Sequence, residues 1–210
     1  KRRGARTLGI INVVGSAIAK AADQTIYTWA GPEIAVATTK GFTTQLAVVY
    51  LLTMHMAKTL GKVDDATYAG WVAALENLPD QVAYLLTDER VEEVKTYAKG
   101  LTKHNNAFYI GRNLDGATCL EGSLKLKEIA YIHSEAYPAG ELKHGPISLI
   151  ENGTLVLGVA TMPDLFDKTM SNIKEVKARG ADVLGVTVEG YEEEIRKYAD
   201  DAIIVPRVHP

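Results

Sequence analysis

The side chains best suited to proton transfer lie in one stretch, Leu120 to Pro146. Glu121, Lys125 and Glu128 follow one another at spacings of four and three residues, so a helix, turning by about 100° per residue, brings them into one narrow stripe. Apolar side chains flank the stripe: Leu124 and Tyr131 on one side, Ile129 and Ile132 on the other. A charged row between apolar walls is expected to be half buried and to face a cleft.

A histidine follows this predicted helix. The helix should end near His133, because Pro138 disfavours helical dihedral angles in its predecessor and Gly140 adds a further break. The segment after it is predicted to be a loop, and it carries His144. An imidazole titrates near neutral pH, so His144 could act beside a glutamate in acid–base catalysis.

The same residues allow a plainer interpretation. A Glu–Lys–Glu ladder is most often an ion-pair stripe on a solvated helix face, worth about 0.2–0.5 kcal/mol per pair. A single histidine in a loop is likewise more often structural or solvated than catalytic. The spacing alone does not decide between an ion-pair stripe and a proton-transfer site.

Strands and helices alternate on both sides of the middle of the chain. Near the start we predict a strand, a helix and a strand, over Leu8–Val13, Gly15–Ala22 and Thr25–Trp29. Later we predict strands over 107–111, 154–160, 182–188 and 202–205, with helices over 165–179 and 192–198. Such alternation is typical of an α/β fold whose parallel sheet has helices on both faces, a doubly wound sandwich.

The middle of the chain is predicted to be helical throughout. A helix runs from about Thr39 to Leu60 and stops at Gly61, although Thr39 or its neighbour could simply cap it. Residues 62–104 form a run of helices without Gly-, Ser- or Pro-rich stretches, so they are not a flexible linker. We therefore divide the chain into a first α/β part (1–61), a helical connection (62–104) and a second α/β part (105–210).

Composition excludes several classes of protein. The 210 residues carry a net charge of −3 without a basic cluster, so nucleic acid and membrane surfaces are not expected partners. Cys119 is the single cysteine, which rules out an internal disulfide framework and suits a reducing cytoplasm. The five histidines show no spacing typical of metal ligands, so neither a metal nor another cofactor is predicted: His55, His104, His133, His144 and His209.

Three blocks of sequence resemble the isomerase part of the glutamine–fructose-6-phosphate aminotransferase family, also called the glucosamine-6-phosphate synthases. They are LEGSLKLKEIAYIHSEAYPAGELKHGP, AGPEIAVATTKGFTTQL and SNIKEVKARGADVLGVT. The resemblance implies two sugar isomerase (SIS) domains, each a doubly wound α/β sandwich, of which this chain holds one in part and one nearly complete. It also implies that the glutaminase domain, the start of the first SIS domain and a C-terminal tail lie outside these residues.

The resemblance assigns roles to five residues. It implies that Glu128 moves a proton between C1 and C2 of the sugar, that Lys125 orients this carboxylate, and that His144 assists ring opening. It places Val36 and Thr38 in the sugar-phosphate site, with Thr38 standing where serine is commoner. It further implies a homodimer in which the loop carrying His144 reaches the neighbouring subunit's site.

The activity implied is conversion of fructose 6-phosphate and glutamine-derived ammonia to glucosamine 6-phosphate in hexosamine biosynthesis. Two alternatives stay open: an SIS enzyme that deaminates or cleaves amino-sugar phosphates, and a non-catalytic module that binds sugar phosphates. Residues 1–210 alone are predicted to be inactive, because the family's imine-forming lysine lies in the tail and its phosphate-binding loop precedes these residues. Cys119 falls within a predicted helix and does not replace the glutaminase nucleophile.

Overall fold

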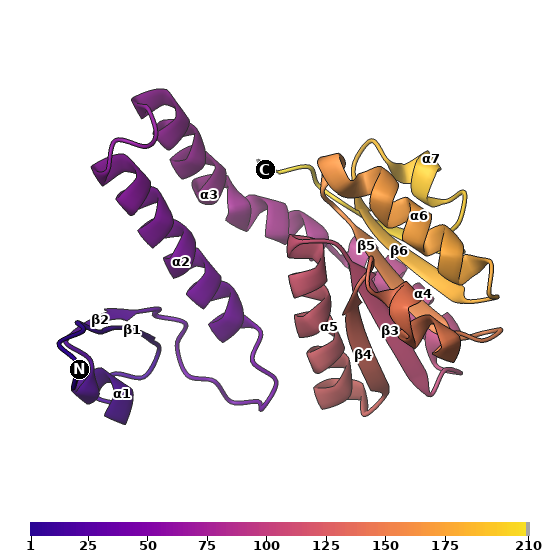
Figure 1. Ribbon diagram of the computed structural model, residues 1–210, viewed down its shortest axis with the longest axis horizontal. Coiled ribbons are helices and arrows are strands. Elements are labelled where there is room, and N and C mark those ends of the chain that lie inside the picture. Colours follow the sequence, from indigo (N-terminus) through magenta and orange to yellow (C-terminus); the bar gives the residue numbers. More distant parts are fainter. Residues whose placement is uncertain (209–210) are drawn as a thin grey trace. The chain divides into compact units, whose positions relative to one another are not determined.

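The computed structural model describes residues 1–208, which form two compact units, and each unit is described by itself (Figure 1). The first comprises residues 1–75 and the second begins at residue 76. His209 and Pro210, the end of the predicted second part, lie outside the described residues. The three-part division at 61 and 104 stays a prediction. None of the helices within residues 1–208 is both long and apolar enough to cross a membrane.

The first unit contains a small parallel sheet and a long helix. Strand β1 (Leu8–Ile11) pairs in parallel with β2 (Gln24–Tyr27), and α1 (Ala17–Ala21) connects them. The loop after β2 is anchored by Asn12, whose side-chain oxygen accepts the N–H of Ala30 at 2.9 Å while its amide donates to the carbonyl of Gly31 at 2.8 Å. This loop leads into α2 (Lys40–Thr59).

Two further helices follow, α3 (Asp65–Leu85) and α4 (Asp88–Leu101), and the boundary between the units falls within α3. Asp64 caps α3 by accepting the N–H of Thr67 at 2.6 Å. Helix α3 continues through Pro79. Proline removes one donor and crowds one carbonyl, and here the turns on both sides keep a single helix.

The second unit is a five-stranded parallel sheet in the order β4-β3-β5-β6-β7. Its strands are β3 (Asn106–Gly111), β4 (His133–Pro138), β5 (Leu155–Ala160), β6 (Asp182–Val188) and β7 (Asp201–Val205). The helices between them are α5 (Leu114–Ala130), α6 (Phe166–Lys177) and α7 (Glu192–Ile195), with short 3₁₀ turns at Leu142–His144, Pro146–Leu149 and Pro163–Leu165. Chain order and strand order together give the doubly wound α/β fold predicted from the sequence (Figure 1).

The two faces of this sheet are covered by different helices. On one face, the ring of Tyr109 lies beside Gly122 of α5, so that a Cβ added there would be 3.0 Å from the ring. On the other face, a Cβ on Gly158 would lie 2.7 Å from Ile173 of α6. Glycine therefore permits close contact between helix and strand. The main core belongs to the α6 face and includes fully buried Ile110 and Ile173.

The segment His133–Pro138 corrects one sequence prediction. It was predicted to be loop, but it is β4, paired in register with β3 from Asn106↔His133 to Gly111↔Pro138. Because many of its residues are polar, the sequence pattern does not indicate a strand here. Ser134 is 1 % exposed, yet its hydroxyl donates to the carbonyl of Ser123 at 2.8 Å, so a polar residue can face α5 without an unsatisfied group.

Candidate active site

Helix α5 holds the charged stripe and is fixed to the sheet by buried polar contacts. Near its start, the buried carboxylate of Asp115 accepts the N–H of Thr161, after β5, at 2.9 Å. Further along, the hydroxyls of Ser123 and Ser134 lie 3.0 Å apart. The helix ends at Ala130, and its C-cap residue Tyr131 takes the left-handed conformation with φ 57°. These contacts fix the buried side of α5 and thereby the direction in which its opposite side faces.

The stripe predicted from the spacing is present as an ion-pair ladder. The ammonium of Lys125 donates a hydrogen bond to Oε2 of Glu128 and lies 3.5 Å from Oε1 of Glu121. The side chains of Glu121, Lys125 and Glu128 are 22 %, 18 % and 25 % exposed. All three are thus half buried, as predicted, and differ from a freely solvated stripe.

The ammonium at the centre of this ladder stays charged. Its hydrogen bond to Glu128 raises the pKa of Lys125, and the charge of Glu121 adds to the effect. A permanently charged lysine beside Glu128 holds that carboxylate in one orientation through its Oε2 atom. The ladder can therefore present a carboxylate, with one oxygen fixed, to a carbon acid.

No second acid or nucleophile in the described residues joins the ladder from the sheet side. Burial raises the pKa of Tyr109, the strand residue that packs on α5, to about 12. Cys119 is 1 % exposed, and burial, helped by the charge of Asp115, raises its pKa to about 12. A buried thiol with its pKa raised in this way is a poor nucleophile at neutral pH.

His144 lies apart from this ladder within the chain. It ends the 3₁₀ turn Leu142–His144, whose Leu142 is 1 % exposed and belongs to the core on the α6 face of the sheet. Glu128 is near the end of α5, before β4 begins, whereas His144 follows the end of β4. In the described residues, the exposed His144 side chain makes no hydrogen bond or ion pair with this ladder. Glu128 and His144 thus belong to elements that pack on opposite faces of the sheet, α5 and the turn of Leu142.

Val36 and Thr38 lie in the first unit, in the loop before α2. Val36 is 90 % exposed, and the hydroxyl of Thr38 lies 3.5 Å from the carbonyl oxygen of Val36. The loop is closed by Lys40, which donates to the carbonyl of Pro32 at 2.6 Å. Thr39 occupies the N-cap position of α2, but its side chain makes no capping hydrogen bond. Val36 is thus exposed, whereas Thr38 is half-buried.

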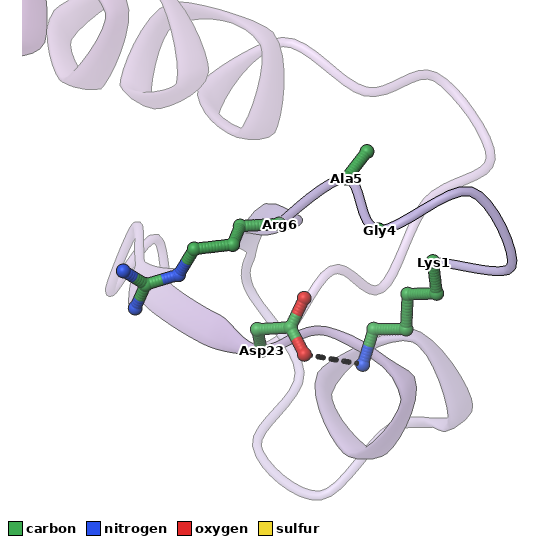
Figure 2. A pocket seen from close by; sticks show the side chains of 5 residues that line it. All are labelled: Lys1, Gly4, Ala5, Arg6 and Asp23. Carbon is green, nitrogen blue, oxygen red and sulfur yellow. Dashed lines mark ion pairs between the residues drawn. The ribbon is translucent and has the colours of Figure 1, made fainter.

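A separate hollow of about 350 Å³ lies in the first unit (Figure 2). It is lined by Lys1, Gly4, Ala5, Arg6 and Asp23. Lys1 pairs with Asp23 at 2.9 Å, and Figure 2 shows the guanidinium of Arg6 pointing away from this pair. The hollow contains none of the residues predicted to act on a substrate. Among residues 1–208 there is also no cluster of three or more His, Cys, Asp or Glu side chains suited to a metal ion.

Sequence reasoning missed the buried polar pairs that fix α5. Asp115 meets Thr161 across 46 residues, and Ser123 meets Ser134 across 11. A polar residue on the buried side of a predicted helix indicates that such a contact exists. The sequence does not show which residue it pairs with. Glu121 was included in the stripe but received no role.

The model of the SIS domain family matches residues 1–55 and 100–208. A glutamine–fructose-6-phosphate aminotransferase (isomerizing) from Symbiobacterium thermophilum is 50 % identical over 209 residues, which are 100 % of this chain and 34 % of that protein. The corresponding protein of Methanosarcina acetivorans is 44 % identical over 96 % of this chain and 32 % of its own length. The chain thus spans about a third of these relatives.

Two solved structures bear on the fold. The C-terminal domain of glucosamine-fructose-6-phosphate aminotransferase from Francisella tularensis matches with a TM-score of 0.90 and 34 % identity, over 96 % of this chain and 56 % of that one. A glucosamine-6-phosphate deaminase from Thermotoga maritima matches with a TM-score of 0.61 and 25 % identity, over 88 % and 53 %.

Proposed function

This chain belongs to the SIS domain family, and we propose that it is the isomerase part of a glutamine–fructose-6-phosphate aminotransferase. The reaction converts fructose 6-phosphate and ammonia, released from glutamine by a glutaminase domain elsewhere in the enzyme, to glucosamine 6-phosphate. The half-buried ladder of Glu121, Lys125 and Glu128 is the observation that carries this proposal. The ladder supplies an oriented carboxylate, and isomerisation requires a base of this kind.

Glu128 is the proposed base. Isomerisation moves one proton from C1 to C2 of the open-chain sugar imine, and one carboxylate placed over both carbons can remove the proton and return it. Lys125 holds one oxygen of Glu128, which leaves the other free to face the sugar. In this proposal Val36 and Thr38, from the loop before α2, line the sugar-phosphate site.

His144 is proposed to assist ring opening in the site of a second copy. Within one chain, Glu128 belongs to the helix on one face of the sheet, while the turn of His144 packs through Leu142 on the other. A two-fold symmetric homodimer resolves this separation, because the loop of each subunit can complete the site of its neighbour. The enzyme is proposed to act in the cytoplasm.

The proposed function is tested with the purified full-length enzyme that carries this segment. Supplied with fructose 6-phosphate and glutamine, it should form glucosamine 6-phosphate, measured by chromatography against a standard. The similarity to a deaminase from Thermotoga maritima motivates the second assay, release of ammonia from glucosamine 6-phosphate. Turnover in the second assay alone would favour the deaminase, and sugar-phosphate binding without turnover in either assay would favour a sensor.

Residues 1–210 by themselves should be catalytically silent. On the proposed function, the lysine that forms the sugar imine and the phosphate-binding loop are supplied by other parts of the enzyme, so neither covalent activation nor substrate positioning is possible. The purified segment, incubated with fructose 6-phosphate and ammonia, should yield no glucosamine 6-phosphate. Detectable product, absent from a Glu128→Gln control, would show that the segment contains every essential group.

A further inference from the structure

Arg112 follows β3 directly, at the edge of the sheet where the parallel strands end, and the proposed function gives it no role. Its Nε–H donates a hydrogen bond to Oδ1 of Asn172, in α6, at 3.1 Å. Asn172 is 4 % exposed, and its amide in turn donates to Oε2 of Glu175 at 3.3 Å. Within residues 1–208 no carboxylate forms an ion pair with Arg112, so charge neutralisation does not account for this arginine. A buried side chain of α6 thus holds its guanidinium.

The guanidinium held in this way lies against the backbone of Gly140. A Cβ added to Gly140 would be 3.0 Å from Nη2 of Arg112 and 3.3 Å from both Cζ and Nη1, so the whole group faces this residue. Gly140 belongs to residues 139–144, which follow β4 and which we call the His144 loop. Contact this close favours glycine, because a side chain would push the guanidinium away from Asn172.

Two buried residues anchor the His144 loop. The N–H of Ala139, which is 0 % exposed, donates to the carbonyl of Gly111 at 2.8 Å. Leu142 is 1 % exposed and belongs to the core. Arg112 contacts the chain between these two anchors. His144 itself is exposed and lies two residues beyond the second anchor, so the place of its imidazole depends on the path of this short loop.

The backbone next to Arg112 is strained. Asn113 has φ 53° and ψ −121°, a combination that residues other than glycine rarely adopt. Backbone strain persists only where surrounding contacts impose it, and it occurs chiefly at functional sites. The strained turn is an observation independent of the contacts of the guanidinium, and it marks the same place in the fold.

We propose that Arg112 is a positioning residue that holds the His144 loop in the conformation in which its imidazole completes the active site. The inference rests on the proposed function, in which His144 assists ring opening in the site of a second copy. Arg112 does not contact the substrate and acts through Gly140. Arginine suits this task because its Nε–H bonds to Asn172 while the planar guanidinium packs on the backbone, whereas lysine has neither group.

Arg112→Ala in the full-length enzyme should lower kcat for isomerisation by about 10- to 100-fold, the effect of displacing a catalytic group by about 1 Å. KM for fructose 6-phosphate should change by less than about twofold, because the residue makes no contact with the sugar. Asn172→Ala and Gly140→Ala should lower kcat in the same way, since each releases or displaces the guanidinium. Arg179→Ala is the matched control, because it removes an exposed arginine of the same unit and should keep wild-type rates.

A double variant distinguishes positioning of His144 from a general loss of activity. If Arg112 acts through His144, the enzyme carrying both Arg112→Ala and His144→Ala should be within about threefold of His144→Ala alone. A further loss of about 10- to 100-fold on top of His144→Ala would show that the two residues act independently, and would overturn the inference.

Mixing of full-length variants shows which site Arg112 serves. If it supports the loop that reaches the second copy, heterodimers of Arg112→Ala with Glu128→Gln contain one intact site and should regain about half the wild-type rate. Heterodimers of Arg112→Ala with His144→Ala contain no intact site and should regain nothing. The reverse result, recovery with His144→Ala only, would place Arg112 with the ladder of its own subunit and overturn the inference.

Failure of this inference can be told apart from failure of the proposed function. If His144→Ala keeps wild-type rates, the proposed role of His144 fails. If His144→Ala is impaired but Arg112→Ala keeps wild-type rates, the role of Arg112 alone is refuted. If Arg112→Ala fails to fold, as judged by circular dichroism and glutamine hydrolysis, Arg112→Lys keeps the charge without the planar group and is held to the same criteria.

Discussion

A full-length enzyme carrying Glu128→Gln should lose sugar isomerisation by about 10²–10⁴-fold, the loss expected when a general base is removed. The substitution keeps the shape of the side chain and one acceptor oxygen, so the ammonium of Lys125 can still be hydrogen-bonded. Affinity for fructose 6-phosphate should therefore remain nearly unchanged, and the loss should appear in kcat. The measurement is steady-state formation of glucosamine 6-phosphate with ammonia as the nitrogen donor.

Two controls accompany this variant. Glu151→Gln makes the same chemical change at an exposed position before β5 and should keep wild-type rates. Glutamine hydrolysis by the same preparation reports that the enzyme is folded. Isomerisation within about threefold of the wild type would contradict the assignment, because removal of a general base has a far larger effect.

Local patterns in the sequence predicted the helices well. The helices predicted from about Thr39 to Leu60 and over 165–179 correspond to α2 and α6. Local patterns failed where tertiary contacts decide the conformation. β4 is polar and ends in Pro138, yet it pairs with β3 along its whole length and forms the edge of the sheet.

The part of the candidate site that lies within a single helix was predictable from the sequence. Glu121, Lys125 and Glu128 are neighbours on one helix, so their spacing alone indicates the ion pairs that the structure contains. The place of His144 depends on topology, namely on which face of the sheet the connection after β4 covers. Neither that face nor the pairing of Asp115 with Thr161 can be derived from residue spacing.

The second large effect is expected from mixing two inactive full-length variants, Glu128→Gln and His144→Ala. Each homodimer lacks one essential group in both of its sites. If His144 serves the neighbouring subunit, a heterodimer combines both substitutions in one site and leaves the other site intact. Random reassociation makes about half of the dimers heterodimers, so about a quarter of wild-type activity should return.

The central claim is that α5 of one copy and the loop of His144 from a second copy build one isomerase site, and this mixing experiment tests it most directly. Heterodimers carrying two different affinity tags are isolated after reassociation, and formation of glucosamine 6-phosphate per dimer is measured. If the site is shared in this way, each heterodimer should turn over at about half the wild-type rate. Heterodimers that form but remain as inactive as the two parent variants would place Glu128 and His144 in the same subunit's site and contradict the claim.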